Sequence, residues 1–94
     1  MSSIATVVNV SGAQAAQVVR ASPGVLQAVQ FTPTAAGNSI ILYDSASAAS
    51  GTILAKIIRS TVDSFLFNPD NPIEAKVGIV ATQTGSSSES EVYI

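Results

Sequence analysis

Residues 38–57 read NSIILYDSASAASGTILAKI, and the expected architecture of the whole chain follows from this stretch. Two apolar runs, residues 40–43 and 52–57, flank a loop of small polar residues at 44–51. Branching at Cβ favours extended backbone for Ile and Thr, and Tyr packs well on a pleated surface. Asp, Ser and Gly in the loop satisfy or relax a turning backbone. We therefore predict a β-hairpin here.

Short extended segments of the same kind occupy the rest of the chain. Turn-forming residues separate them at intervals of about 8–12 residues, which is typical of a sandwich or barrel. The predicted strands are residues 2–10, 13–19, 25–32, 40–43, 52–57, 61–67, 73–81 and 90–94. The sequence thus predicts an all-β fold, a seven- to eight-stranded antiparallel β-sandwich that is jelly-roll-like. The pattern does not give the order of the strands.

The composition predicts one small domain, residues 1–94, that gains stability by association. A chain of this length buries roughly 60–65% of its unfolded surface, so its core is thin. It has no cysteine to cross-link that core, and it combines 47% hydrophobic with only 11% charged residues. Many surface positions must therefore be uncharged, which suits a surface covered by a second copy. A neutral monomer coated with Ser and Thr is the alternative.

The charge pattern argues against two classes of partner. Four scattered cations and a net charge of -2 cannot neutralise a run of phosphates, so we expect no nucleic-acid binding. The first residues, MSSIAT, have neither the basic nor the apolar region of a signal peptide. No run of about 18 apolar residues predicts a membrane span. We expect a soluble protein that is made in a cytoplasm and does not bind membranes.

The sequence predicts no enzyme and no cofactor. The absence of His and Cys excludes Ser-His-Asp and Cys-His catalysis and the usual zinc sites. The six glycines are spread along the chain and form no phosphate-binding loop. Asp44, Asp63 and Asp70 are explained by a loop start, an exposed strand face and a turn. They do not predict a carboxylate pair.

Two loops carry oxygen ligands of the kind that calcium prefers. These are residues 68–71, with Asn68, Asp70 and Asn71, and residues 44–47, with Asp44, Ser45 and Ser47. Neither has the spacing of an EF-hand loop. Side chains that bond their own backbone explain both loops more simply, so we predict no metal site.

Strand alternation selects candidate contact residues. In residues 73–81 it places Ile73, Ala75, Val77, Ile79 and Ala81 inward and Val80 outward. Side chains opposite the predicted core, and those of the N-terminal strand, are the candidates for contact with another protein. The candidate interface residues are Ile4, Val7, Tyr43, Leu54, Val80 and Tyr93.

The segment IILYDSASAASGTILA at residues 40–55 resembles a segment common in short virion proteins of tailed bacteriophages. The shared features are LYD, a loop of small residues, SGT and an apolar run. The turn and strand ASPGVL at residues 21–26 and the low charge are also similar to that group. The resemblance covers residues 21–57 and extends more loosely over the C-terminal half. It fixes no catalytic position.

This resemblance implies a non-enzymatic structural protein of the virion. The expected role is a head decoration (cement) protein on the capsid surface, which binds and stabilises the major capsid protein. Such proteins are often trimeric, so we expect a homo-oligomer. The alternative is a β-sandwich module of a tail or fibre that attaches to host-surface glycan through Tyr43 or Tyr93. A structural β-domain of non-viral origin is a third hypothesis.

Overall fold

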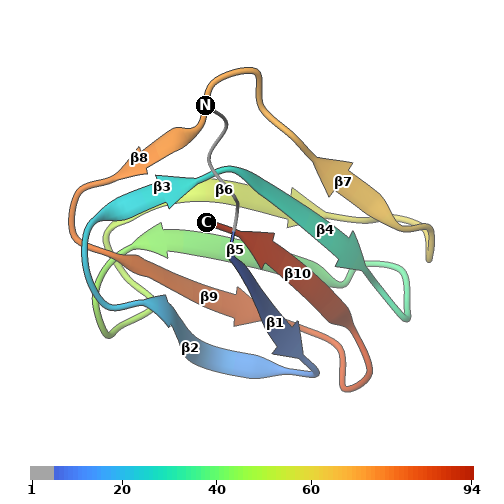
Figure 1. Cartoon of the computed structure of the whole chain (residues 1–94). Coiled ribbons are helices and arrows are strands. Elements are labelled where there is room, and N and C mark those ends of the chain that lie inside the picture. The colour runs from blue at the N-terminus through green and yellow to red at the C-terminus, as the bar shows by residue number, and fades with distance from the viewer. Residues whose placement is uncertain (1–5) are drawn as a thin grey trace.

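The computed structural model describes residues 6–94, and within this range the chain forms strands and loops without a helix (Figure 1). All strand pairs are antiparallel, which confirms the predicted all-β antiparallel fold. The ten strands are β1 (Val7–Ser11), β2 (Gln14–Arg20), β3 (Gly24–Leu26), β4 (Ala28–Thr32), β5 (Ser39–Asp44), β6 (Thr52–Ile58), β7 (Phe65–Phe67), β8 (Ile73–Ala75), β9 (Ile79–Gln83) and β10 (Glu89–Tyr93).

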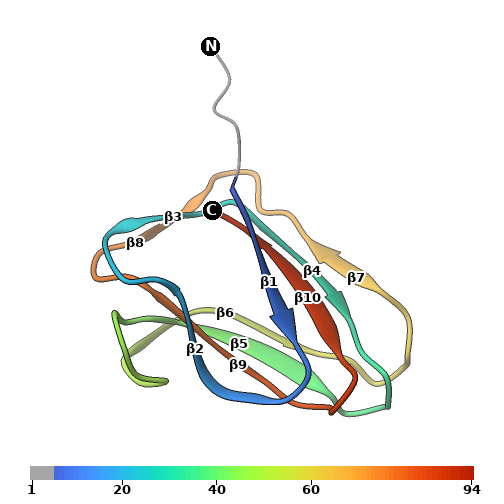
Figure 2. The same ribbon diagram turned by 60° about the horizontal axis from the view of Figure 1, so that its bottom comes forward.

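The strands form two four-stranded sheets and one short pair. Sheet A has the order β1-β10-β4-β7, and sheet B has the order β2-β9-β5-β6. The pair β3-β8 lies at one end of the molecule (Figure 2). The inward side chains of both sheets and of this pair form one apolar core. The arrangement is therefore sandwich-like.

The strand pairs are nested along the chain. Strand β1 pairs with β10, β2 with β9, β3 with β8, β4 with β7 and β5 with β6. The chain thus forms one long folded ribbon whose tip is the loop between β5 and β6. Two further pairs, β10 with β4 and β9 with β5, close the ribbon into the two sheets.

The core is filled by side chains that alternate along the strands, as period-two patterning requires. Sheet A contributes mainly β-branched residues and one large aromatic ring, Phe31, which is fully buried. The fully buried Ile40, Leu42 and Ile79 come from sheet B. Leu26 and Ala75, from the short pair, close the end of the core. The alternation predicted for residues 28–32 agrees with the burial of Val29 and Phe31. The alternation predicted for residues 52–57 sets Ile53 on the face of Ala55 and Ile57, and this is wrong for Ile53, which is 48% exposed.

Two predicted strands are each broken in two, which raises the count from eight to ten. The strand predicted at 25–32 breaks at Gln27 because β3 pairs with β8 whereas β4 pairs with β10 and β7. The strand predicted at 73–81 breaks at residues 76–78. The backbone N–H groups of these residues donate to the carboxylate of Asp44. Val77 is consequently 50% exposed, so its predicted inward position is wrong.

Gly78 allows two other segments to approach this break. A Cβ at Gly78 would lie 2.6 Å from the carbonyl oxygens of both Arg20 and Ser45, so no larger residue fits without a backbone shift. Ser45 also donates its N–H to the Gly78 carbonyl at 3.2 Å. The β5–β6 loop is therefore held against the connection from β8 to β9.

The ends of the described chain are paired. The strand predicted at 90–94 is present as β10, and Ile94 exchanges two 2.9 Å backbone hydrogen bonds with Thr6. Of the strand predicted at 2–10, residues 2–5 lie outside the described residues, and β1 covers Val7–Ser11. The strand predicted at 61–67 begins only at Phe65.

Candidate interaction surfaces

The candidate contact residues fall on two opposite faces of the sandwich. Val7 is paired with Tyr93 on the outer face of sheet A. Tyr43 is paired with Val80 on the outer face of sheet B. Ile4 lies outside the described residues. The candidates therefore do not form one surface, and each pair belongs to a different face.

Two of the candidates are less accessible than alternation predicts. Val80 points outward but is fully buried. Strand β9 is central in sheet B, so Val18 of β2 and Tyr43 of β5 flank Val80 directly. Leu54 is also partly buried and packs against the core. A register shift between β5 and β6 at this point sets Tyr43 opposite Ile53 and leaves Leu54 as the extra residue of a bulge.

The outer face of sheet B is apolar. The register places Val18, Val80, Tyr43 and Ile53 in one row across its four strands. Val18 is 46% exposed and Ile53 is 48% exposed. The next row holds Thr82, the half-buried Ile41 and Lys56. We call Val18, Ile41, Tyr43 and Ile53 the apolar face.

Two rows of side chains on the outer face of sheet A are polar across β1, β10 and β4. The register sets Asn9, Glu91 and Gln30 in one row and Ser11, Glu89 and Thr32 in the next. Ser11 Oγ donates to Glu89 Oε1 at 2.9 Å. A shallow depression of about 310 Å³ lies among these residues. The two outer faces thus differ in chemistry, and the acidic charge is on sheet A.

Four exposed apolar side chains lie between the end of β6 and the end of β7. They are Ile58, Val62, Phe65 and Leu66, with exposed fractions of 58%, 59%, 36% and 50%. The guanidinium of Arg59 lies over the Phe65 ring, 4.8 Å from its centroid. We call these four residues the β6–β7 surface. Ile58 ends β6, Phe65 and Leu66 lie in β7, and Val62 lies in the connection between these strands. None of them was among the contact residues predicted from the sequence.

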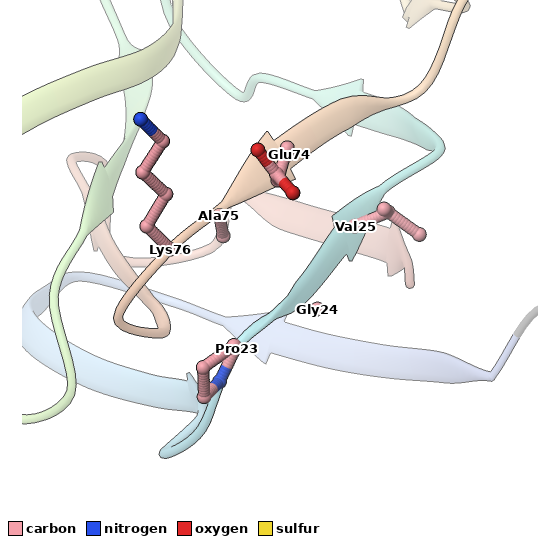
Figure 3. Close-up of a pocket in the computed structure, with 6 residues that line it drawn as sticks. All are labelled: Pro23, Gly24, Val25, Glu74, Ala75 and Lys76. Atoms are coloured by element: carbon pink, nitrogen blue, oxygen red, sulfur yellow. The ribbon is translucent and has the colours of Figure 1, made fainter.

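A depression of about 550 Å³ lies beside the β3–β8 pair (Figure 3). Its lining residues come from 23–25 and 74–76. The Lys76 side chain extends away from Pro23, Gly24 and Val25 (Figure 3). Polar groups therefore do not converge here in the way that a catalytic or small-molecule site requires.

Asp44, considered above as a loop carboxylate or calcium ligand, joins two corners of the fold. Its Oδ1 accepts the N–H of Val77 at 2.8 Å and that of Gly78 at 3.3 Å. Its Oδ2 accepts the N–H of Lys76 at 3.0 Å. The bonds from Val77 and Lys76 lower the pKa of the carboxyl, and partial burial opposes them. These three N–H donors explain why a carboxylate lies at this position of the fold.

A buried polar network lies at the opposite end of β9. Gln83 is 2% exposed, and its Nε2 contacts the carbonyl oxygens of Val10, Gly12 and Ser88 at 3.0, 2.8 and 3.0 Å. Ser90 Oγ donates to Gln83 Oε1. The sequence analysis missed Gln83 because the predicted strand ended at residue 81. Gln83 continues the every-second-residue spacing of the inward-facing Ile79 and Ala81. Strand alternation extended by two residues would therefore have placed its side chain in the core.

Comparisons of the chain with protein-family models, with curated proteins and with solved structures find no match. Among residues 6–94, no helix is long and apolar enough to cross a membrane. The same part of the chain contains no group of three or more His, Cys, Asp or Glu side chains suited to a metal ion. The chemistry of the surfaces is therefore the basis for assigning a function to this protein.

Proposed function

We propose that this protein is a non-enzymatic structural protein of a bacteriophage virion, a homo-oligomeric head decoration (cement) protein that binds and stabilises the capsid. It would be made in the host cytoplasm and would reside on the capsid surface. The observation that carries the proposal is the apolar face of sheet B. A sheet face with half-exposed Val18 and Ile53 in a chain of this size is typical of a surface that another protein covers.

The strand order supports a role in a particle. Nested pairing from β1 with β10 to β5 with β6, closed into two four-stranded sheets, is the order expected of a jelly roll whose two long strands are each interrupted. Jelly rolls occur in viral capsid proteins and in lectins. Because one fold serves many functions, this agreement supports the proposal only together with the surface chemistry.

The apolar face suits the capsid contact that cementing requires. Such a contact has an apolar centre that excludes water and a polar rim. Tyr43 brings a large ring and a hydroxyl to the middle of the face, and Ile53 extends it toward the edge of the sheet. Lys56, in the neighbouring row, places a cation at the rim. This arrangement needs no reacting group, in agreement with the non-enzymatic proposal.

The test is binding to capsids that lack the protein, with two tyrosine variants compared. We expect the wild type to bind these capsids and to raise their heat resistance. Tyr43→Ala should bind the capsids about tenfold more weakly, because a central aromatic residue carries much of the binding energy of an interface. It should therefore also raise their heat resistance less than the wild type does. Tyr93→Ala, a matched change on the opposite face, should keep both. Absence of binding by the wild type, or equal losses in the two variants, would refute the proposed contact.

The second candidate function is a tail or fibre module that binds host-surface glycan. The polar depression on sheet A favours it, because Asn9, Gln30 and Thr32 offer amide and hydroxyl groups there. Tyr93 lies on the same outer face, whereas Tyr43 lies on the other, so the two tyrosines cannot form one platform. On a glycan array, this candidate predicts binding that is lost in Tyr93→Ala and retained in Tyr43→Ala. The two functions thus give opposite results with the same pair of variants.

A further inference from the structure

We infer that two copies of this protein pack through the outer faces of their B sheets, as a two-fold dimer in which β6 of each copy covers β2 of the other. The inference rests on the proposed function, because the same face is assigned there to the capsid. The dimer would cover the apolar face before assembly, and the capsid would then replace the second copy. A second copy and the capsid thus compete for one surface.

The outer face of sheet B extends beyond the rows that contain Val80 and Thr82. Ile58 is paired with Ser39, which shares the outward face of β5 with Ile41 and Tyr43. Thr84 donates its N–H to the Ser39 carbonyl at 2.9 Å, so it lies at the same level of the sheet. A third row therefore holds Thr84, Ser39 and Ile58, and Ile58 belongs to this face as well as to the β6–β7 surface.

The two edge strands of this face carry side chains of different size. Strand β2 lies beside β1 on one side of the sandwich, the β1–β2 side, and β6 leads to β7 on the opposite side, the β6–β7 side (Figure 2). Ile53 and Ile58, exposed by 48% and 58%, project from β6. At the other edge, a shallow depression of about 480 Å³ lies where β2 begins and β9 ends. Its lining includes the small side chains of Ala13, Ala15, Thr82 and Thr84.

A two-fold axis parallel to the strands matches the projecting edge of one copy to the depression of the other. The axis lies between β9 and β5, the two central strands, so it sets β6 over β2 twice. Positions along the strands are kept by this rotation. Ile58 therefore faces the depression beside Thr84, and Ile53 faces Val18. The same contact fills the depressions of both copies, so the face is complementary to itself in shape.

Charge favours this axis over the alternative axis, across the strands. Lys56 is the one charged side chain in the three rows. The parallel axis sets it over Ala15, whose carbonyl accepts the Thr82 hydroxyl in the middle row. The two lysines are then about 14 Å apart or more, three strand spacings, which exceeds the Debye length of about 8 Å at physiological salt. An axis across the strands would stack β6 on β6, with Lys56 against Lys56 and both depressions empty.

The size of the face predicts a weak dimer. Its central strands, β9 and β5, have five and six residues. Four strands about 4.8 Å apart, with a rise of about 3.3 Å per residue, cover roughly 350 Å² in projection. A standard interface buries about 800 Å² per partner, and smaller contacts are weak or transient. A weak dimer suits a face that is released to another partner.

The first test is disulfide cross-linking between copies, because the chain has no cysteine of its own. A mixture of Val18→Cys and Ile53→Cys copies should cross-link at least tenfold faster than either variant alone. The dimer sets these two positions opposite each other. Like positions lie about 14 Å apart, whereas a disulfide needs Cα atoms within about 7 Å.

The matched control is a mixture of Val25→Cys and Val77→Cys copies. These side chains are similarly exposed, by 40% and 50%, at the β3–β8 end of the molecule. This mixture should not cross-link. Equal cross-linking in the control mixture, or in the samples of one variant alone, would overturn the inference.

Sedimentation over a range of concentrations tests the dimer without cysteines. We expect the wild type to pass from dimer to monomer on dilution. Ile58→Gln should weaken the dimer by about tenfold, because two apolar contacts are lost in each dimer. Val62→Gln changes a side chain of nearly equal exposure, 59%, outside the face and should dimerise like the wild type. Equal losses in the two variants would contradict the inferred contact.

Capsid binding tests the competition and separates the inference from the proposed function. The dimer cross-linked between Val18→Cys and Ile53→Cys should not bind capsids that lack the protein, and reduction of the disulfide should restore binding. A cross-linked dimer that binds as well as its reduced form would overturn the competition. A wild type that binds capsids but stays monomeric at every concentration would overturn the inference and leave the cement function standing. A wild type that dimerises but ignores capsids would refute the cement function and leave the dimer standing.

Discussion

Replacing Gln83 with Leu should destabilise the fold more than its small change in volume suggests. Gln83 is buried, and its amide links β9 to the carbonyls of Val10, Gly12 and Ser88, while Ser90 donates to its carbonyl oxygen. Leu fills a similar volume but bonds none of these groups. The substitution therefore leaves polar groups unpaired in the interior, where water does not replace the lost partner.

The cost can be estimated group by group. The Ser88 carbonyl keeps the N–H of Gly12, at 2.7 Å, so it retains a partner. The Gly12 carbonyl and the Ser90 hydroxyl lose the partners identified here. Each unpaired buried group costs about 1–3 kcal/mol. The added apolar burial of Leu returns about 1 kcal/mol. We expect a net loss of about 3 kcal/mol, a large fraction of the roughly 5–15 kcal/mol typical of a folded domain.

Urea denaturation at a fixed protein concentration measures this loss, because any self-association adds to apparent stability. With an m-value of about 1–1.5 kcal/mol per molar, the midpoint should fall by about 2–3 M. Thr82→Val is the control at the adjacent residue. It removes only the 3.0 Å bond from Thr82 Oγ1 to the Ala15 carbonyl on the outer face, so it should cost at most about 1 kcal/mol. Equal midpoints for wild type and Gln83→Leu would refute the network's structural role.

Three further predictions concern other parts of the fold. Asp44→Asn should destabilise the protein at neutral pH, and urea midpoints should show this difference shrinking as pH falls below 3.8, the ordinary value of the carboxyl pKa. The sign follows because a pKa lowered in the folded state contributes stability above the unfolded pKa that is lost as pH falls through the folded one. Gly85→Ala should cost about 2–4 kcal/mol, since φ is +98° and a Cβ would collide with Asn38 and Ser88. Gly37 also has a positive φ, +88°, but a Cβ there would meet no other atom within 4 Å. Thermal melting of Gly37→Ala should therefore show about half the stability loss of Gly85→Ala or less. Leu42→Ala removes a fully buried side chain and should cost about 2–5 kcal/mol by the same measurement, and a loss below 1 kcal/mol would contradict its place in the core.

The sequence predicted local structure well where one face of a strand is buried. The hairpin of β5 and β6 is present, and the alternation in β4 agrees with the burial of Val29 and Phe31. These predictions succeed because period-two patterning records which side of a strand faces the core. The antiparallel sandwich follows from many short strands in a small chain. The strand order does not, because any strand with one apolar face can pair with several others.

The breaks in the strands could not be predicted from patterning. Residues 73–81 alternate without interruption, yet residues 76–78 leave the ladder to bond Asp44, which is more than thirty positions earlier in the sequence. A long-range hydrogen bond of this kind leaves no periodic signal. Gly78 is the one local indication, since a glycine within a strand often marks a bulge or a close approach of backbone.

The candidate contact residues show the same limit. Alternation identified Val80 as outward but could not show that β9 is central, where neighbouring strands bury even an outward side chain. It also could not select Val62, which lies in the loop before β7 and is 59% exposed. The exposure of a side chain depends on which face of the strand it lies on and on whether its strand is central or at an edge of the sheet. The second factor is set by the pairing of strands that are distant in the sequence.

The two sides of the sandwich differ in how their edges are protected. On the β1–β2 side, Gln17 Nε2 donates to the Asn9 carbonyl at 2.9 Å and ties one edge strand to the other. Strand β2 also has two register shifts against β9, and such bulges twist an edge and hinder further pairing. Strand β6 has one shift, at its start, and runs regularly from Ala55 to its exposed end at Ile58. A partner on the β6–β7 side would therefore cover edge backbone as well as apolar side chains, whereas a partner on the face around Tyr43 would meet side chains alone.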